Sequence, residues 1–356
     1  MSALLTAGAV DVTPRDLSFL WLEITARCNL ECAHCYAESG PRGELLGQMS
    51  TDDWLAVLRD AADVGCRHVQ FIGGEPTLHP DLSRMISFAS ARGYTFIEVF
   101  TNATTISEAV LQTFVGHDVH VATSFYSDDP ETHDSITNRR GSFDRTVSNI
   151  RRLLAAGLHV RAGVIETPAN VGHAERAKRF LEGLGVSEIR IDFQRGVGRG
   201  AQRLHSLDPM AELCGECWKG KLCVTPSGRS YPCVFSRFAD VGQAKEGIRK
   251  VLKEDALSEF RYRLKEYRSR KDLSNTARTG AGGAGVGATN LAMSACGPDV
   301  ICDPDLTCPP NCGPHSSSCG PTQFCVPSRM CPPELSCNPT TGPCVPDHGC
   351  MPYSQG

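Results

Sequence analysis

The sequence predicts an α/β fold in which parallel strands alternate with helices and form a partial (βα)6 TIM-type barrel. Five times, a helical pattern ends in glycine and a run of β-forming residues follows. Glycine easily takes the left-handed conformation that ends a helix. The segment Phe19–Thr25, "FLWLEIT", adds a strand before the first unit, so six strands alternate with five helices. The glycines are Gly65, Gly93, Gly116, Gly157 and Gly185.

The later strands are expected, in order, within "CRHVQFI", "YTFIEVF", "HDVHVAT", "LHVRAGVI" and "VSEIRID". Periodicity alone also fits an open, doubly wound sheet. In both arrangements the chemistry is expected at the carboxyl ends of the strands. Polar segments follow three of these ends: "GGEPT" after the second strand, "TNAT" after the third and "SFYS" after the fourth.

Four regions are predicted along the chain. A small cysteine-rich region follows the barrel and the segment "RGVGRGAQ", and its "TPSGR" reads as a turn between two short β runs. A charged, helical segment then passes into a linker of flexible composition. The boundaries are residues 1–200 for the barrel, 201–274 for the cysteine-rich region, 275–294 for the Gly/Ala-rich linker and 295–356 for a tail rich in cysteine and proline.

Composition excludes several classes of protein. A net charge of −4 without a long basic run gives no support for a nucleic-acid partner. The first residues, "MSALLTAGAVDVTPRD", show neither a signal peptide nor a membrane span, so we expect a cytoplasmic protein. In that reducing compartment, 18 cysteines indicate metal or cluster binding more than disulfides.

The first cysteine group lies directly after the first strand. Cys28, Cys32 and Cys35 have the spacing C-x3-C-x2-C. A structural zinc site would need a fourth ligand, for which His34 is a candidate, but so tight a loop has little slack to surround one ion. An iron–sulfur cluster of four irons needs only three cysteines if its fourth iron is kept for another ligand. A thioredoxin-like redox pair would leave Cys28 unexplained.

"CNLECAHC" after the first strand and "GGEP" after the second resemble the motifs of radical S-adenosylmethionine (SAM) enzymes, and the resemblance covers about residues 15–200. In that family, the fourth iron of a [4Fe–4S] cluster binds the amino and carboxylate groups of SAM. An electron from a low-potential donor such as flavodoxin or ferredoxin then cleaves SAM, and the 5'-deoxyadenosyl radical that forms takes a hydrogen atom from the substrate.

The resemblance implies a role for each matching position. Glycines near the methionine amino group would permit close backbone approach. Ordinary loop caps are the alternative for the ribose and adenine contacts. "THDSITNRRGSF" (Thr132–Phe143) also resembles a segment of the branch with additional clusters. The implied sites are Cys28, Cys32 and Cys35 for the cluster, His34 beside the adenine, Gly73, Gly74 and Glu75 near the methionine amino group, and Asn102, Ser124 and "IETP" (Ile165–Pro168) for ribose and adenine.

The second cysteine group resembles the hairpin that opens the auxiliary-cluster extension called SPASM or, when shorter, twitch. Its four thiols, Cys214, Cys217, Cys223 and Cys233, suffice for one auxiliary iron–sulfur cluster, and a zinc-ribbon-like site is the alternative. The chain departs from the complete SPASM pattern because its C-x2-C precedes the hairpin. This leaves the number of auxiliary clusters open.

The tail carries ten cysteines from Cys296 onward, each starting a C-x-P triplet. Cys302, Cys308 and Cys312 reproduce C-x5-C-x3-C, so these first cysteines are favoured as cluster ligands. So much proline, glycine and serine does not support an ordinary packed core. A metal-delivery arm, a fused substrate-like segment and a disordered tail are the other interpretations.

We therefore expect a radical SAM enzyme that modifies a ribosomally made peptide. A sugar or another small molecule is the alternative substrate, and an iron–sulfur or zinc scaffold without catalysis is the second alternative. Only a short arm precedes the first strand, so a peptide substrate is expected to dock directly or to need a separate leader-peptide-binding protein.

Overall fold

The computed structural model describes residues 17–202 and 208–279, and side chains are described as far as residue 270. The predictions for the N-terminal arm, for the Gly/Ala-rich linker beyond residue 279 and for the Cys-x-Pro tail, with Cys302, Cys308 and Cys312, lie outside these residues. The division into four regions stays a prediction.

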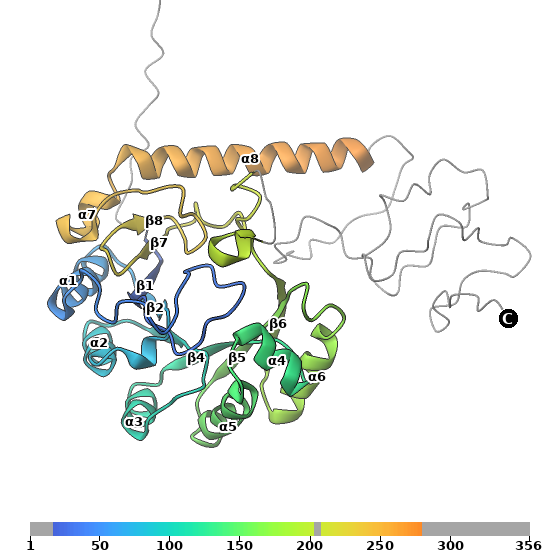
Figure 1. The fold of residues 1–356 in the computed structure, drawn as a ribbon. Coiled ribbons are helices and arrows are strands. Elements are labelled where there is room, and N and C mark those ends of the chain that lie inside the picture. The colour runs from blue at the N-terminus through green and yellow to red at the C-terminus, as the bar shows by residue number, and fades with distance from the viewer. Residues whose placement is uncertain (1–16, 203–207, 280–356) are drawn as a thin grey trace, which may run out of the picture. The chain divides into compact units, whose positions relative to one another are not determined.

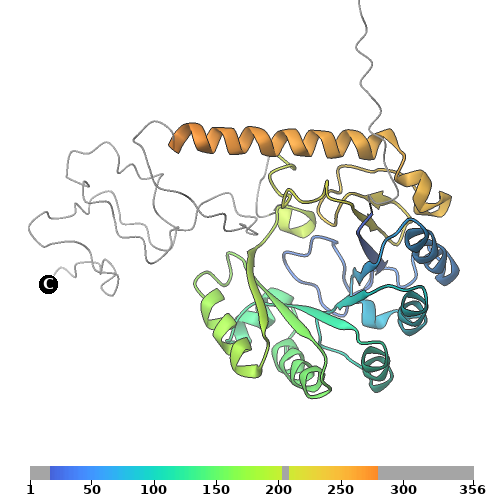
Figure 2. The same cartoon turned by 180° about the vertical axis from the view of Figure 1, so that it is seen from behind.

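Six parallel strands form a curved sheet with the helices on its outer side (Figures 1 and 2). Their order in the sheet is their order in the chain, each strand pairing in parallel with the next. This confirms the predicted partial barrel. The strands are β1 (Phe19–Thr25), β2 (His68–Gly73), β3 (Phe96–Phe100), β4 (His120–Phe125), β5 (Val160–Glu166) and β6 (Glu188–Phe193).

Six helices, and not the expected five, connect these strands. The additional helix arises between β4 and β5, where the chain turns from one helix into the next through left-handed residues, Asn138 (φ 53°) and Gly141 (φ 73°). The helices are α1 (Thr51–Asp63), α2 (Leu82–Ala91), α3 (Glu108–Gly116), α4 (Pro130–Thr137), α5 (Ser142–Ala155) and α6 (Ala174–Leu184).

Glycine ends the helices as predicted at four of the five junctions. The exception is Gly116, which is the last residue of α3 and has no positive φ. The left-handed residue there is Asp118 (φ 49°), because a short polar side chain also tolerates this conformation. The four confirmed positions are Gly65 (φ 94°), Gly93 (φ 81°), Gly157 (φ 80°) and Gly185 (φ 97°).

The two faces of the sheet differ in chemistry. Leu20, Leu22 and Ile24 of β1 are fully buried in the main hydrophobic core. Polar residues such as Glu23 and Glu98 occupy the alternate strand positions and therefore lie on the other face of the sheet. On β3 the Glu98 carboxylate, with its side chain 2% exposed, forms a two-pronged ion pair with Arg161 of β5 (Nε–Oε1 2.6 Å, Nη2–Oε2 2.7 Å).

A hairpin extends the sheet beyond β1. Strands β7 (Lys221–Val224) and β8 (Ser230–Tyr231) are antiparallel, and the turn between them contains Gly228 (φ 81°), as the sequence predicted. Strand β7 also pairs in parallel with β1, placing Cys223 beside Trp21. The sheet therefore has eight strands, in the order β6-β5-β4-β3-β2-β1-β7-β8.

The chain then continues through short helices to α8 (Asp255–Thr279), which confirms the expected charged helical segment. Helix α8 lies beside the β7–β8 hairpin in both views (Figures 1 and 2). The short helices on this path are η4 (Ala244–Glu246) and α7 (Ile248–Val251), while η2 (Pro76–Leu78) follows β2 and η3 (Gly198–Gln202) follows β6. Within the described ranges, no helix is both long and apolar enough to cross a membrane.

Candidate functional site

Residues 26–40, here called the cysteine loop, lie between β1 and α1 and carry all three cysteines of the first group. Cys28 is buried, whereas Cys32 and Cys35 are half-buried. The amide of Cys28 donates to the carbonyl of Gly40 (3.0 Å), so the two ends of the loop are tied together. The loop therefore holds its three thiols within a closed turn at the carboxyl end of the sheet.

The glycines after β2 lie directly against this loop. The Gly74 amide donates to the Thr25 carbonyl (2.8 Å) and the Glu75 amide to the Arg27 carbonyl (2.8 Å). A Cβ at Gly74 would lie 2.1 Å from the Arg27 carbonyl oxygen, and Gly73 has a φ of 125°. Only glycine fits such an approach. The structure thus brings the predicted Gly73 and Gly74 to the first cysteine group.

Glu75 is fully buried, and its carboxylate accepts hydrogen bonds from neighbouring strand ends. Its donors include the Thr77 hydroxyl (2.7 Å), the Thr101 hydroxyl (2.6 Å) and the Asn102 amide (2.7 Å). Burial raises the pKa of Glu75, against the opposing effect of these hydrogen bonds. The predicted Glu75 therefore joins the end of β2 to the end of β3.

Asn102 contacts the loop through its side chain. Its Nδ2 donates to Asn29 Oδ1 (2.8 Å) and approaches Cys28 Sγ at 3.6 Å. Burial, with Glu75 as the next cause, raises the pKa of the Cys28 thiol to about 12, and burial also raises that of Cys32. Metal binding would displace the protons of these thiols.

Tyr126, just beyond β4, is a site residue that the sequence reasoning did not single out. Its hydroxyl contacts both the predicted Ser124 and Cys32. Its ring meets that of His34 edge-on, with 5.0 Å between the ring centroids. The segment "SFYS" contains Tyr126, but nothing in the local pattern distinguishes it from a core aromatic residue.

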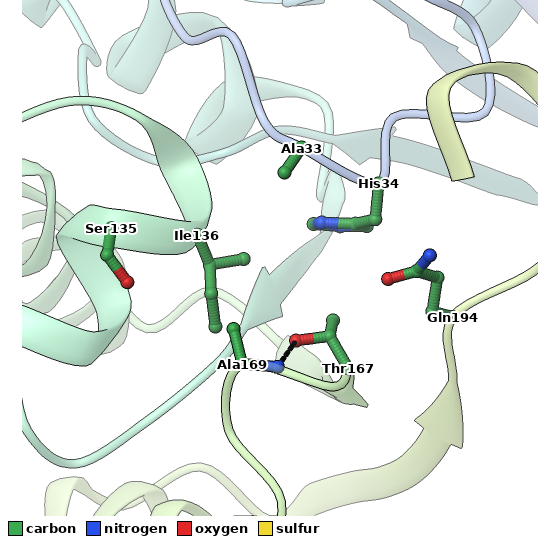
Figure 3. A pocket seen from close by; sticks show the side chains of 7 residues that line it. All are labelled: Ala33, His34, Ser135, Ile136, Thr167, Ala169 and Gln194. Atoms are coloured by element: carbon green, nitrogen blue, oxygen red, sulfur yellow. Dashed lines mark hydrogen bonds between the residues drawn. The ribbon is translucent and has the colours of Figure 1, made fainter. Parts of the chain in front are cut away.

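A pocket of about 240 Å³ opens between the cysteine loop, α4 and the ends of β5 and β6. His34 and Gln194 lie near each other on one side of it, across from Ser135 and Ile136 (Figure 3). Thr167, from the predicted "IETP" segment, also lines the pocket, whereas Gly73, Glu75, Asn102 and Ser124 do not. The lining residues are Ala33, His34, Ser135, Ile136, Thr167, Ala169 and Gln194.

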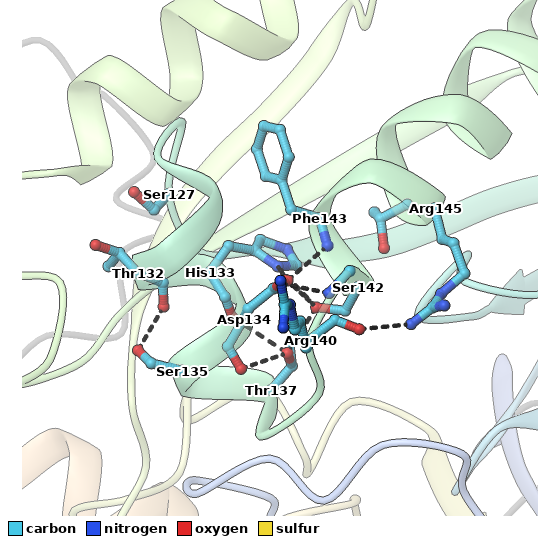
Figure 4. Close-up of polar contacts among 12 residues, drawn as sticks. Ser127, Thr132, His133, Asp134, Ser135, Thr137, Arg140, Ser142, Phe143 and Arg145 are labelled. Carbon is cyan, nitrogen blue, oxygen red and sulfur yellow. Dashed lines mark hydrogen bonds and ion pairs between the residues drawn. The ribbon is translucent and has the colours of Figure 1, made fainter.

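The segment "THDSITNRRGSF" forms the turn from α4 into α5, which we call the α4–α5 clasp (residues 132–143). Asp134 closes it by accepting from the Ser142 hydroxyl (2.8 Å) and the Phe143 amide (2.9 Å) (Figure 4). The carbonyl of Thr137 accepts from the Glu31 amide of the cysteine loop (3.2 Å). The clasp thus holds one edge of the loop.

The second cysteine group gathers in a separate small core, and Cys217 and Cys233 are buried. The Cys217 thiol forms hydrogen bonds with the thiols of Cys214 and Cys233, and these contacts raise its pKa. Cys223, on β7, is also buried, and burial, with Glu23 as the next cause, raises its pKa. The structure therefore brings three of the four thiols into direct contact and places Cys223 against β1.

Helix α8 covers this second group. Arg268 donates to the carbonyl of Cys214 (2.5 Å). A Cβ at Gly215 would lie 1.8 Å from the Arg268 Nε, so the guanidinium fills the space that this glycine leaves free. In the described part of the chain, no three His, Cys, Asp or Glu side chains have the geometry to hold a single metal ion.

Residues 22–173 match the model of the radical SAM superfamily. The antilisterial bacteriocin subtilosin biosynthesis protein AlbA of Bacillus subtilis is 26% identical over 60% of this chain and 54% of its own length. The mycofactocin maturase MftC of Mycobacterium tuberculosis is 31% identical over 53% of this chain and 48% of its own length. The chain therefore spans about half the length of these relatives.

Solved structures share the fold. The crystal structure of Streptococcus suis SuiB bound to S-adenosylmethionine matches with a TM-score of 0.56 and 16% identity, over 68% of this chain and 66% of that one. Another SuiB structure, with similar values, holds the precursor peptide SuiA. The structure of anSMEcpe with bound AdoMet matches with a TM-score of 0.53 and 15% identity, over 68% and 82% of the chains.

Proposed function

Because residues 22–173 of this chain match the model of the radical SAM superfamily, we propose that it is a radical SAM enzyme that matures a ribosomally made peptide. The observation that carries the activity is the arrangement of Cys28, Cys32 and Cys35 on one closed loop, against the glycines that follow β2. When bound, a [4Fe–4S] cluster and SAM supply a 5'-deoxyadenosyl radical, which takes a hydrogen atom from the substrate.

The residues of the loop fit such a cluster. Thiolates are the ligands that iron–sulfur clusters take in proteins, and three of them stand here on a loop whose ends are joined by a backbone hydrogen bond. In this proposal Cys28, Cys32 and Cys35 hold the cluster, and Asn102 and Tyr126 orient two of the sulfurs through their side-chain contacts.

The pocket beside His34 fits the nucleoside part of SAM. His34 and Gln194 line one side, Ser135 and Ile136 the other, and Thr167 and Ala169 contribute the floor. His34 offers a flat ring and Gln194 an amide that both donates and accepts hydrogen bonds. Gly73 and Gly74 let the end of β2 pack directly against the cysteine loop, where the family resemblance puts the methionine part. Glu75 supports this end of the sheet through its bonds to β3.

We further propose that Cys214, Cys217, Cys223 and Cys233 hold an auxiliary iron–sulfur cluster. The support is the mutual contact of three of these thiols in a dry core covered by α8. Cys223 lies on β7, the strand that pairs with β1, and the nearby charges of Glu23 and Cys233 both raise the pKa of its thiol.

The proposal of a peptide substrate is based on the similar proteins. AlbA is named for bacteriocin biosynthesis, MftC is named a maturase, and SuiB has been crystallised with a precursor peptide. A short reading frame beside the gene would supply the candidate substrate. Incubation with the loaded enzyme should yield a modified peptide, lighter by two hydrogen atoms for each crosslink or altered in configuration at unchanged mass, whereas a peptide unchanged in both mass and configuration would count against this substrate.

The radical activity is tested by anaerobic reconstitution with iron and sulfide, followed by dithionite and SAM. We expect 5'-deoxyadenosine from wild type and from Cys66→Ala, whose buried thiol donates to the His68 carbonyl away from the loop. The triple variant Cys28→Ala/Cys32→Ala/Cys35→Ala should form none. Equal yields from the triple variant and iron-loaded wild type would refute the assignment.

A further inference from the structure

We infer that Arg199 is a positioning residue that sets the geometry of the cysteine loop and thereby of its thiol ligands. It lies in η3, within the segment "RGVGRGAQ" that follows β6, far from the loop in sequence. The inference rests on the proposed cluster site, because it concerns the shape of the loop that carries Cys28, Cys32 and Cys35.

Arg199 binds three carbonyl groups of this one loop. Its backbone amide donates to the Cys35 carbonyl (3.0 Å), its Nε to the Cys32 carbonyl (2.8 Å) and its Nη2 to the Ser39 carbonyl (2.7 Å). The guanidinium is a planar fork with fixed donor directions. It therefore fixes the distance between the carbonyls of Cys32 and Ser39, which lie on either side of Cys35.

The neighbouring glycines bring Arg199 this close. Gly198 has a φ of 58°, and a Cβ there would lie 2.3 Å from the Tyr36 carbonyl oxygen. A Cβ at Gly200 would lie 2.1 Å from the Arg195 carbonyl oxygen and 3.4 Å from that of His34. A side chain at Gly198 would push η3 away from the loop, whereas one at Gly200 would displace the Arg195 carbonyl within the segment that carries Arg199. The two glycines therefore permit these hydrogen bonds.

The opposite edge of the loop is held by the α4–α5 clasp. The amides of Glu31 and Ala33 donate to the carbonyls of Thr137 (3.2 Å) and Ile136 (3.1 Å). The clasp thus binds amides on both sides of Cys32, whereas Arg199 binds the Cys32 carbonyl itself. Without Arg199, the part of the loop from Glu31 to Ser39 would keep its two hydrogen bonds to the clasp but would lose its three hydrogen bonds to η3.

The test compares Arg199→Gln and Arg199→Lys with wild type and with Arg92→Gln, a control at the end of α2 that pairs with Asp63. Each reconstituted protein is reduced, and its electron paramagnetic resonance spectrum is recorded with and without SAM. Only a cluster that binds SAM changes its spectrum, so auxiliary clusters do not interfere. Iron release to a chelator is timed in parallel, and the melting temperature of the iron-free protein reports folding.

We expect Arg199→Gln to lose the SAM-dependent signal, or to release the iron of the cysteine-loop cluster about tenfold faster than wild type. The loss of hydrogen bonds from a charged donor predicts an effect of this size. Arg199→Lys keeps the charge without the fork, and we expect it to be intermediate. Wild-type spectra and release rates in Arg199→Gln would overturn the inference. Should that variant fail to fold, wild-type behaviour of Arg199→Lys would do so. A SAM-independent spectrum in wild type would instead refute the proposed function.

Discussion

The acid stability of the protein should depend on His133 in the α4–α5 clasp. This side chain is 1% exposed, its Nδ1 lies 3.2 Å from the Ser142 hydroxyl oxygen, and the rings of Phe125 and Phe143 surround it. Burial lowers the pKa of His133 to about 4, although Asp134 acts in the opposite direction. We therefore expect a neutral imidazole in the folded protein at pH 7.

The magnitude follows from this pKa. The unfolded chain, with an ordinary histidine pKa of about 6.5, takes up the proton first as the pH falls. The stability that the neutral side chain contributes is complete above about pH 6.5 and is lost as the pH falls toward 4. Between pH 7 and pH 5 the loss amounts to about 2 kcal/mol of unfolding free energy.

Urea titrations of the iron-free protein at pH 7, 6 and 5 measure this loss. His133→Phe keeps a ring among its aromatic neighbours, so its stability should fall about 2 kcal/mol less than that of wild type over this range. His68→Gln, at an exposed position of β2, is the matched control and should behave like wild type. Equal losses in wild type and His133→Phe would refute the reasoning.

Three further predictions concern the sheet and its two cysteine groups. Gly74→Ala places a Cβ 2.1 Å from the Arg27 carbonyl oxygen, so urea titration should show a loss of more than about 2 kcal/mol. Arg161→Met leaves the Glu98 carboxylate buried without its cation, and the same assay should show a loss of about 3 kcal/mol that Glu98→Gln partly restores. Cys217→Ala should lose iron but keep the SAM-dependent paramagnetic signal, measured on reconstituted protein.

Each of these has an outcome that contradicts it. Gly116→Ala is the matched glycine control, since an added Cβ there meets nothing within 4 Å. If Gly74→Ala were as stable as this control, the close approach to the cysteine loop would be wrong. If the stability losses of Arg161→Met and Glu98→Gln simply added up in the double variant, the two residues would not be coupled. If Cys217→Ala kept its full iron content, the proposed auxiliary cluster site would be wrong.

Much of the barrel could be predicted because its signals are local. Phe19–Thr25 was expected as a strand and is one, with the same bounds. A helical pattern that ends at Gly65 or Gly185 predicts that the next strand begins within a few residues. The motifs after β1 and β2 meet as expected because neighbouring parallel strands end at the same edge of the sheet.

Other features depend on contacts that leave no local pattern. The pairing of β7 with β1 joins segments about 200 residues apart, and neither segment specifies its partner. Arg199 binds backbone carbonyls, which every residue has, so its targets carry no sequence signature. The second helix between β4 and β5 was missed because its start at Gly141 looks like an ordinary turn.

Because β7 pairs with β1, a single strand serves as the common support of two thiol groups. The cysteine loop extends from the carboxyl end of β1, while Cys223 stands beside Trp21 in the middle of the same strand. A strand rises by a fixed length of about 3.3 Å per residue. The separation between the cysteine loop and Cys223 is therefore set by the strand register. Deleting one residue between Trp21 and Thr25 would shorten this separation and turn the cysteine loop to the opposite face of the sheet.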